Sequence, residues 1–137
     1  MVGIVIVTHS NLGSAIIDAA EFVLGAGPEA VVAVSIDLKE DPEKLRKKIA
    51  NAIKSVNRNK GILVLTDMFG GTPSNLSYSF LEEGKVEVLS GVNLPILIKA
   101  IDIRQKMDLS KMAKNLENFG KRSISLASGI LKGNKRG

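Results

Sequence analysis

Four runs of mainly apolar residues recur along the chain, at positions 3–7, 30–36, 61–66 and 86–90. The first, Gly-Ile-Val-Ile-Val, has no polar side chain, and the second and third are nearly as apolar. Short runs of this kind are typical of strands that are covered on both faces in a parallel sheet. We therefore predict four strands, of which the first three are buried.

Between these runs, apolar residues recur every three or four positions, which is the spacing of an amphipathic helix. The positions that would face the core are Ile16, Ala20, Val23 and Leu24, then Leu45, Ile49, Ile53 and Val56, then Ile96, Leu97, Ala100 and Ile103, and finally Leu109, Met112, Ala113, Leu116 and Phe119. A further helix is expected to begin at Thr72 and to run through Phe80 and Leu81. Capping patterns support these helices. The expected N-caps are Ser10 or Asn11, Asp41, Thr72, and Asp108 or Ser110, and the expected stops are Gly25, Gly84 and Gly120.

Strands that alternate with helices favour a parallel open sheet with helices on both faces, which is a three-layer α/β/α arrangement. We predict the strand order 2-1-3-4, in which the winding of the chain reverses between the first and third strands. Ligands of such sheets bind at this switch point, beyond the carboxyl ends of the strands. The residues that follow the first and third strands are therefore the candidates for function.

Composition limits the chemistry that the chain can perform. At 137 residues, with 45% hydrophobic and 24% charged residues, it is expected to form one globular domain. We place this domain at residues 1–129, followed by a basic tail at 130–137. The chain has no Cys and a single His, which excludes disulfides, thiolate catalysis and a histidine-rich metal site. We expect no metal and no cofactor.

The distribution of charged and apolar residues bears on nucleic-acid binding, on membrane insertion and on secretion. The net charge is +5, most of the basic residues lie at 39–60 and 104–136, and residues 1–38 contain no Lys or Arg. The first basic stretch is interleaved with acidic residues and has no aromatic residue, which is typical of a solvated helix face rather than a nucleic-acid interface. No apolar run approaches the roughly 18 residues of a membrane span, and no signal-peptide pattern opens the chain. We expect a cytoplasmic protein that does not bind nucleic acid.

The two polar residues that end the first and third strands form a candidate catalytic pair. His9, the only histidine, follows the first strand, and Asp67 follows the third. A carboxylate that accepts the N–H of a neutral imidazole fixes the tautomer and leaves the other ring nitrogen free as a nucleophile. Considered alone, His9 could simply pack in a loop and Asp67 could be a structural cap, but the predicted strand order brings them together.

The loop after Asp67 contains a candidate anion site at Gly70, Gly71 and Thr72. Glycines allow the backbone to approach a ligand closely, and N–H groups at the start of a helix favour negative charge. The alternative is that these glycines only form a tight turn. Together with a nucleophilic histidine and an orienting aspartate, the turn predicts transfer of a phosphoryl group through a phosphohistidine.

Three stretches of the sequence resemble one known family. They are Val-Ile-Val-Thr-His-Ser at 5–10, Leu-Thr-Asp-Met-Phe-Gly-Gly-Thr-Pro-Ser-Asn at 65–75, and Gly-Val-Asn-Leu-Pro at 91–95. They are similar, in order and spacing, to the IIA component (EIIA) of the mannose/fructose/sorbose family of the bacterial phosphoenolpyruvate-dependent sugar phosphotransferase system (PTS). The resemblance covers residues 1–129.

This resemblance implies specific roles and partners. His9 would accept a phosphoryl group from the phosphocarrier HPr and pass it to a IIB component, which makes the protein a phosphotransferase in sugar uptake. Asp67 would orient His9, and Gly70, Gly71 and Thr72 would hold the phosphoryl group. Membrane IIC and IID components would be indirect partners. The sequence does not name the sugar, because specificity in this system belongs to other components.

Three other functions remain as alternatives. A phosphotransfer subunit of dihydroxyacetone kinase would share the fold and the histidine, but its loop after the third strand has a different sequence. A receiver domain phosphorylated on Asp67 would need an acidic pair after the first strand, where this chain has Thr8 and His9. An ATP-dependent kinase or NTPase would need a Gly-x-x-x-x-Gly-Lys-Ser/Thr motif, which the sequence lacks.

The segment 123–126, Ser-Ile-Ser-Leu, alternates polar and apolar residues, as a half-exposed strand does. Such a strand at a sheet edge invites pairing with another chain. The family resemblance implies a homodimer in which this segment adds antiparallel to the partner's sheet. We therefore expect a C-terminal antiparallel edge strand that is exchanged in a dimer, with the alternative that it folds back onto its own sheet.

Overall fold

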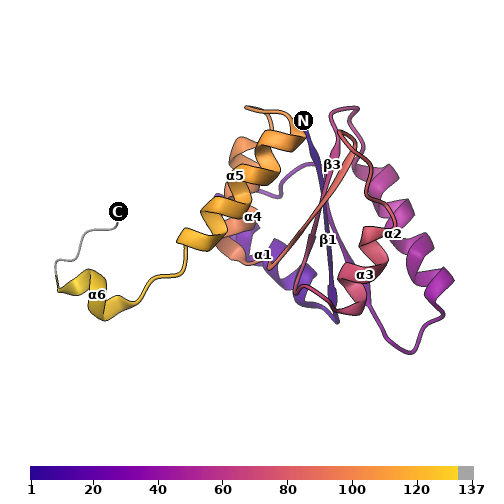
Figure 1. Ribbon diagram of the computed structural model, residues 1–137, viewed down its shortest axis with the longest axis horizontal. Helices are drawn as coiled ribbons and strands as arrows, with labels where there is room; N and C mark the ends of the chain where they lie inside the picture. Colours follow the sequence, from indigo (N-terminus) through magenta and orange to yellow (C-terminus); the bar gives the residue numbers. More distant parts are fainter. Residues whose placement is uncertain (133–137) are drawn as a thin grey trace.

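The computed structural model describes residues 1–132 and shows a parallel sheet between two layers of helices (Figure 1). The strands are β1 (Gly3–His9), β2 (Val31–Ile36), β3 (Ile62–Thr66) and β4 (Val86–Ser90). The helices are α1 (Leu12–Leu24), α2 (Pro42–Val56), α3 (Thr72–Tyr78), α4 (Leu94–Ile103), α5 (Leu109–Arg122) and α6 (Ala127–Leu131). Among the described residues, no helix is long and apolar enough to cross a membrane.

The strand order is β2-β1-β3-β4 and all neighbouring strands are parallel, which confirms the predicted order. β1 lies in the interior of the sheet, paired with β2 on one side and β3 on the other. Its residues are buried from Gly3 to Thr8 because both of its faces are covered. His9, at its carboxyl end, emerges from this layer with partial exposure.

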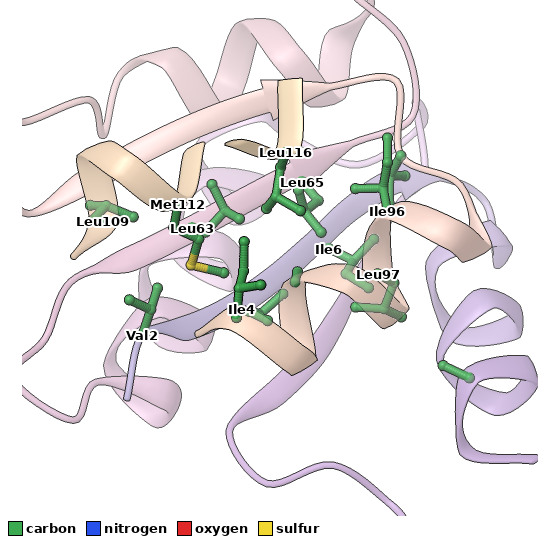
Figure 2. Packing of buried hydrophobic residues seen from close by; sticks show 14 residues of the cluster. Val2, Ile4, Ile6, Leu63, Leu65, Ile96, Leu97, Leu109, Met112 and Leu116 are labelled. Carbon is green, nitrogen blue, oxygen red and sulfur yellow. The ribbon is translucent and has the colours of Figure 1, made fainter. Parts of the chain in front are cut away.

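Alternation along the strands divides the interior into two cores. Even-numbered residues of β1 and odd-numbered residues of β3 pack against α1, α4 and α5; Figure 2 shows Ile4, Ile6, Leu63 and Leu65 with Leu97. The opposite side chains, such as Val5 and Val7 of β1, pack against α2 and α3. The two cores hold the ends of β1 and β3 in fixed register, which is what places the candidate pair.

Several expected boundaries differ in the structure. β2 was expected to be buried, but it lies at an edge of the sheet and only Val34 and Ile36 are fully buried. α5 continues past Gly120 to Arg122. Gly120 therefore lies inside the helix. A Cβ at this position would come within 2.9 Å of Ile96 Cδ1, so the glycine permits close packing of α5 against α4 rather than ending the helix.

The helix after β3 is shorter than predicted. It ends at Tyr78 rather than extending through Phe80 and Leu81, which form a turn that leads to β4. Thr72 is its first helical residue, and the N-cap is Gly71. The helix therefore begins one residue earlier than predicted: Thr72, expected as the N-cap, is the first helical residue, and Pro73 is the second.

The C-terminal segment is not a strand within the single chain. Residues 123–126 have no strand pairing among the described residues, and α6 follows them away from the body of the domain (Figure 1). Ile124 and Leu126 are 85% and 77% exposed. The exchanged edge strand and the dimer stay predictions. The expected boundary after Gly129 falls inside α6, and residues 133–137 of the expected tail lie outside the described residues.

Candidate functional site

The carboxyl ends of β1 and β3 bring His9 and Asp67 together, as the predicted strand order requires. His9 Nδ1 lies 2.8 Å from Asp67 Oδ2, and the backbone N–H of His9 donates to the same oxygen at 2.9 Å. Asp67 Oδ1 accepts the backbone N–H of Met68 at 2.9 Å. Both carboxylate oxygens are therefore held, and the carboxylate in turn fixes the imidazole.

This geometry leaves one ring nitrogen of His9 available. A neutral imidazole that donates from Nδ1 keeps its lone pair on Nε2. The side chain of His9 is 38% exposed, whereas that of Asp67 is 11% exposed. The arrangement leaves the His9 ring partly exposed to solvent and largely buries the carboxylate bonded to it.

The hydrogen bonds at Asp67 also fix its charge. Burial by itself raises the pKa of the Asp67 carboxyl, but the backbone N–H of His9, the imidazole bond and charge, and the N–H of Met68 outweigh burial and lower the pKa below its ordinary value. Asp67 is therefore a carboxylate at neutral pH, and as such it can accept a hydrogen bond from the Nδ1–H of His9.

The two glycines of the predicted anion turn have different roles. Gly70 has a φ of +84°, which side chains other than glycine disfavour, and a Cβ there would meet nothing within 4 Å. Gly71 has an ordinary φ of −84°, but a Cβ there would lie 2.9 Å from His9 Cε1 and 3.5 Å from Nε2. The backbone thus approaches the Cε1 and Nε2 atoms of the imidazole at Gly71, and Gly70 supplies the turn before it.

Thr8 supports the loop on the other side of the pair, a role that the sequence analysis did not assign. Its side chain is fully buried, and its hydroxyl accepts the N–H of Gly13 at 2.9 Å in the first turn of α1. Ser10, just beyond His9, adopts a positive φ of 52°. The signal in the sequence is a threonine directly before each functional residue, Thr8 before His9 and Thr66 before Asp67.

An open groove lies next to the loop that follows Asp67, along the edge of β4 that no strand of the described residues covers. Its volume is about 560 Å³, and its lining includes Phe69 and Tyr78, the β4 residues Val88 and Leu89, and Ile124 from the C-terminal segment. Phe69 and Met68 are 79% and 54% exposed, so the loop after Asp67 presents apolar side chains beside His9.

The chain is similar to known proteins over most of its length. Residues 3–117 match the protein family described as "PTS system fructose IIA component". The chain belongs to this family of PTS IIA components. The similarity inferred from the three motifs is thereby confirmed.

Individual relatives of this IIA component extend the match over nearly the whole chain. The PTS fructose-specific EIIA component of Bacillus subtilis (strain 168) is 29% identical over 129 residues, which cover 93% of this chain and 88% of the relative. The PTS mannose-specific EIIAB component of Escherichia coli (strain K12) is 32% identical over 104 residues, or 75% of this chain and 32% of that protein. The crystal structure of an EIIA component from Streptococcus agalactiae superposes with a TM-score of 0.83 at 29% identity, covering 93% of this chain and 98% of that chain.

Membership in the family establishes a general activity. PTS IIA components are phosphotransferases that work with a phosphocarrier and with IIB partners. The sheet order 2-1-3-4 with flanking helices matches the EIIA structures. The roles of particular residues in this chain are a separate matter.

Proposed function

We propose that this chain is a phosphoryl carrier of a sugar PTS, in which His9 accepts a phosphoryl group from phosphorylated HPr and passes it to a IIB component. The observation that carries the proposal is the 2.8 Å contact between His9 Nδ1 and Asp67 Oδ2. It commits one ring nitrogen to the carboxylate and leaves the other, at the carboxyl end of β1, free to react.

The proposed transfer uses only groups at the carboxyl ends of β1 and β3. The lone pair of His9 Nε2 attacks the phosphorus of phosphohistidine on HPr, the P–N bond of the donor breaks, and its electron pair returns to the donor imidazole. The carboxylate of Asp67 stabilises the positive charge that develops on the His9 ring. The same step, with His9 as the leaving group, delivers the phosphoryl group to IIB.

The turn at Gly70, Gly71 and Thr72 is the proposed phosphate-binding element. The close approach of Gly71 to His9 Cε1 and Nε2 supports this, because a phosphoryl group on Nε2 would lie against the backbone of the turn. Backbone N–H groups stabilise phosphoryl oxygens without a metal ligand set. Thr72 would add its N–H and hydroxyl at the start of α3.

The proposal extends to assembly and location. We propose a cytoplasmic homodimer that meets the membrane IIC and IID components only through IIB. Two features support the dimer: the groove along the outer edge of β4, and the exposed apolar side chains of Ile124 and Leu126, which pair with no strand in the described part of the chain. An apolar segment and an unpaired strand edge on the same chain suit reciprocal pairing.

Labelling with phosphoenolpyruvate tests the function. We expect that enzyme I and HPr together transfer labelled phosphate to the wild-type protein, and that IIB then removes it. The label should be lost in acid and kept in base, and His9→Ala should take up none. A label that survives acid but is released by hydroxylamine would place the phosphate on Asp67 and support the receiver alternative.

A further inference from the structure

Three hydroxyl groups form a cluster beneath the loop that follows β3. Thr66 Oγ1 lies 2.8 Å from both Ser74 Oγ and Ser90 Oγ, and the two serine oxygens are 3.2 Å apart. Thr66 and Ser74 are completely buried. The cluster joins the carboxyl ends of β3 and β4 to the first turn of α3, and none of its members has a part in the transfer described above.

The cluster is connected to the loop through one hydroxyl. Ser74 Oγ donates a hydrogen bond to the backbone carbonyl of Met68. The N–H of Met68 donates to Asp67 Oδ1, and Asp67 Oδ2 accepts from His9. A path of hydrogen bonds therefore leads from a buried serine to the imidazole, with the backbone of Met68, from its carbonyl to its N–H, as the covalent link in the middle.

The loop depends on such bonds because packing contributes little to it. Met68 and Phe69 expose more than half of their side chains, and Gly70 has no side chain to bury. A segment with few buried apolar contacts opens at low free-energy cost unless hydrogen bonds hold it. Ser74 holds the carbonyl of Met68 and is itself held by Thr66 and Ser90 at the carboxyl ends of β3 and β4.

We propose that Ser74 is a positioning residue for phosphoryl transfer. By holding the carbonyl of Met68, it limits rotation of the backbone at Met68 and so keeps the Met68 N–H on Asp67 Oδ1, which holds Oδ2 toward His9 Nδ1. Thr66 and Ser90 orient the Ser74 hydroxyl for this bond. The inference rests on the proposed function, since it concerns how the same histidine is prepared for attack.

Ser77→Ala is a matched control for Ser74→Ala. Ser77 lies in the same helix and is also completely buried, but its hydroxyl donates to the carbonyl of Pro73 within α3, at 2.6 Å. Both substitutions remove one buried hydroxyl, so both should lower the melting temperature. Only Ser74→Ala should disturb the loop and the imidazole.

Two measurements on the folded proteins distinguish a positioning role from a structural one. The first is the single-turnover rate of transfer from phosphorylated HPr, which we expect to fall roughly tenfold or more in Ser74→Ala, as misplacement of a reacting group does. The second is the ¹⁵N spectrum of the His9 ring, which is free of overlap because the chain has one histidine. Ser74→Ala should increase the share of the Nε2–H tautomer, and Ser77→Ala should change neither quantity.

The outcomes separate this inference from the proposed function. If the wild-type protein takes up no phosphate on His9, the proposed function itself fails. If the wild type is labelled and Ser74→Ala matches Ser77→Ala in rate and tautomer, the positioning role alone is overturned. Should Ser74→Ala not fold at the assay temperature, Ser74→Cys offers a weaker donor of similar size, with an intermediate rate as the expected result and a wild-type rate as the contrary one.

Discussion

In the proposed mechanism, His9 reacts through the ring nitrogen that its hydrogen bond to Asp67 leaves free. The 2.8 Å contact at Nδ1 and the second bond from the His9 backbone place a single carboxylate oxygen between two donors of the same residue. Rotation of the imidazole would break the side-chain bond, so the geometry selects Nε2. The consequences of this selection can be tested one side chain at a time.

Asp67→Asn should preserve the fold and slow the transfer. An amide can turn its NH₂ toward Nδ1, which favours the tautomer with the proton on Nε2. The comparable substitution in a serine protease lowers kcat about 10⁴-fold. Because phosphohistidine is an activated donor, we expect a smaller loss here, measured as the single-turnover rate from phosphorylated HPr. A wild-type rate would show that Asp67 is only structural.

Acid should weaken the protein through the same carboxylate. The folded protein lowers the pKa of Asp67 below its ordinary value of 3.8, so its ionised form stabilises the fold. This contribution is complete above the ordinary pKa and is lost as the pH falls through the lowered one. Thermal melts of wild type and Asp67→Asn should therefore differ at pH 7, and the difference should shrink as the pH falls below the ordinary pKa of 3.8. A difference that stays constant with pH would contradict the assigned ionisation.

Gly71→Ala should impair transfer more than Gly70→Ala. The added Cβ at 71 would lie 2.9 Å from His9 Cε1, so the ring or the loop must move. At Gly70 the cost is the positive φ, on the order of 1 kcal/mol, without a clash. We expect Gly70→Ala to lower the melting temperature and to retain transfer in the folded protein. The reverse ranking of transfer rates would indicate that Gly71 serves only the turn.

The opposite end of the strands is held by a buried arginine that follows α4. Arg104 is 4% exposed and donates to the backbone carbonyls of Val2, Glu29 and Ala30 at 2.6–3.0 Å. These carbonyls precede β1 and β2, so one guanidinium ties the helix to the starts of both strands. The strands are thus fixed at one end while His9 and Asp67 occupy the other.

Arg104→Met should destabilise the fold without affecting the chemistry. Buried carbonyls that lose their donors cost about 1–3 kcal/mol, and we expect a total near the upper end in chemical denaturation. Arg46→Met, which removes a surface ion pair with Glu43, is the control and should cost less than about 1 kcal/mol. Equal losses in the two variants, or a defect in labelling of folded Arg104→Met, would contradict this division of roles.

The elements show which features a sequence encodes locally. β1 and the start of α2 at Asp41 and Pro42 were predictable because an apolar run and an N-cap are properties of adjacent residues. The partial burial of β2 was not, because an apolar run does not reveal whether a strand is central or at an edge. Gly120 was misinterpreted as a stop because only the packing against Ile96 explains it.

The candidate site followed the same division. His9 and Asp67 could be paired in advance, because a single assumption, the strand order, places the ends of β1 and β3 side by side. The cluster of Thr66, Ser74 and Ser90 could not, because its members come from three elements and meet only after α3 packs against the sheet. Hydroxyl residues are also too common for their spacing to indicate a contact.

On the scale of the whole molecule, exposed apolar side chains gather in its C-terminal segment. α6 and the segment before it extend from the domain, and Ile124, Leu126 and Leu131 are each more than three-quarters exposed. The groove along β4 lies beside the start of this segment, since its lining includes Lys121 and Ile124. A second copy that receives the segment would cover both apolar surfaces.

Removal of residues 124–137 should convert a dimer into a monomer. A chain that ends at Ser123 retains the complete α5, so the His9 site should remain built and accept phosphate. Light scattering gives the mass of both proteins, and circular dichroism confirms that the shorter one is folded. A full-length monomer, or a shortened chain that stays dimeric with unchanged stability, would contradict the exchange.

The most direct test of the central claim is to locate the phosphoryl group on the intact protein. The protein is labelled with ¹⁵N at its single histidine, phosphorylated with phosphoenolpyruvate, enzyme I and HPr, and examined by ³¹P and ¹⁵N NMR. We predict one phosphorus signal, coupled to Nε2 of His9, with Nδ1 protonated and bonded to Asp67. Coupling to Nδ1, or an acyl phosphate on Asp67, would contradict the proposed mechanism.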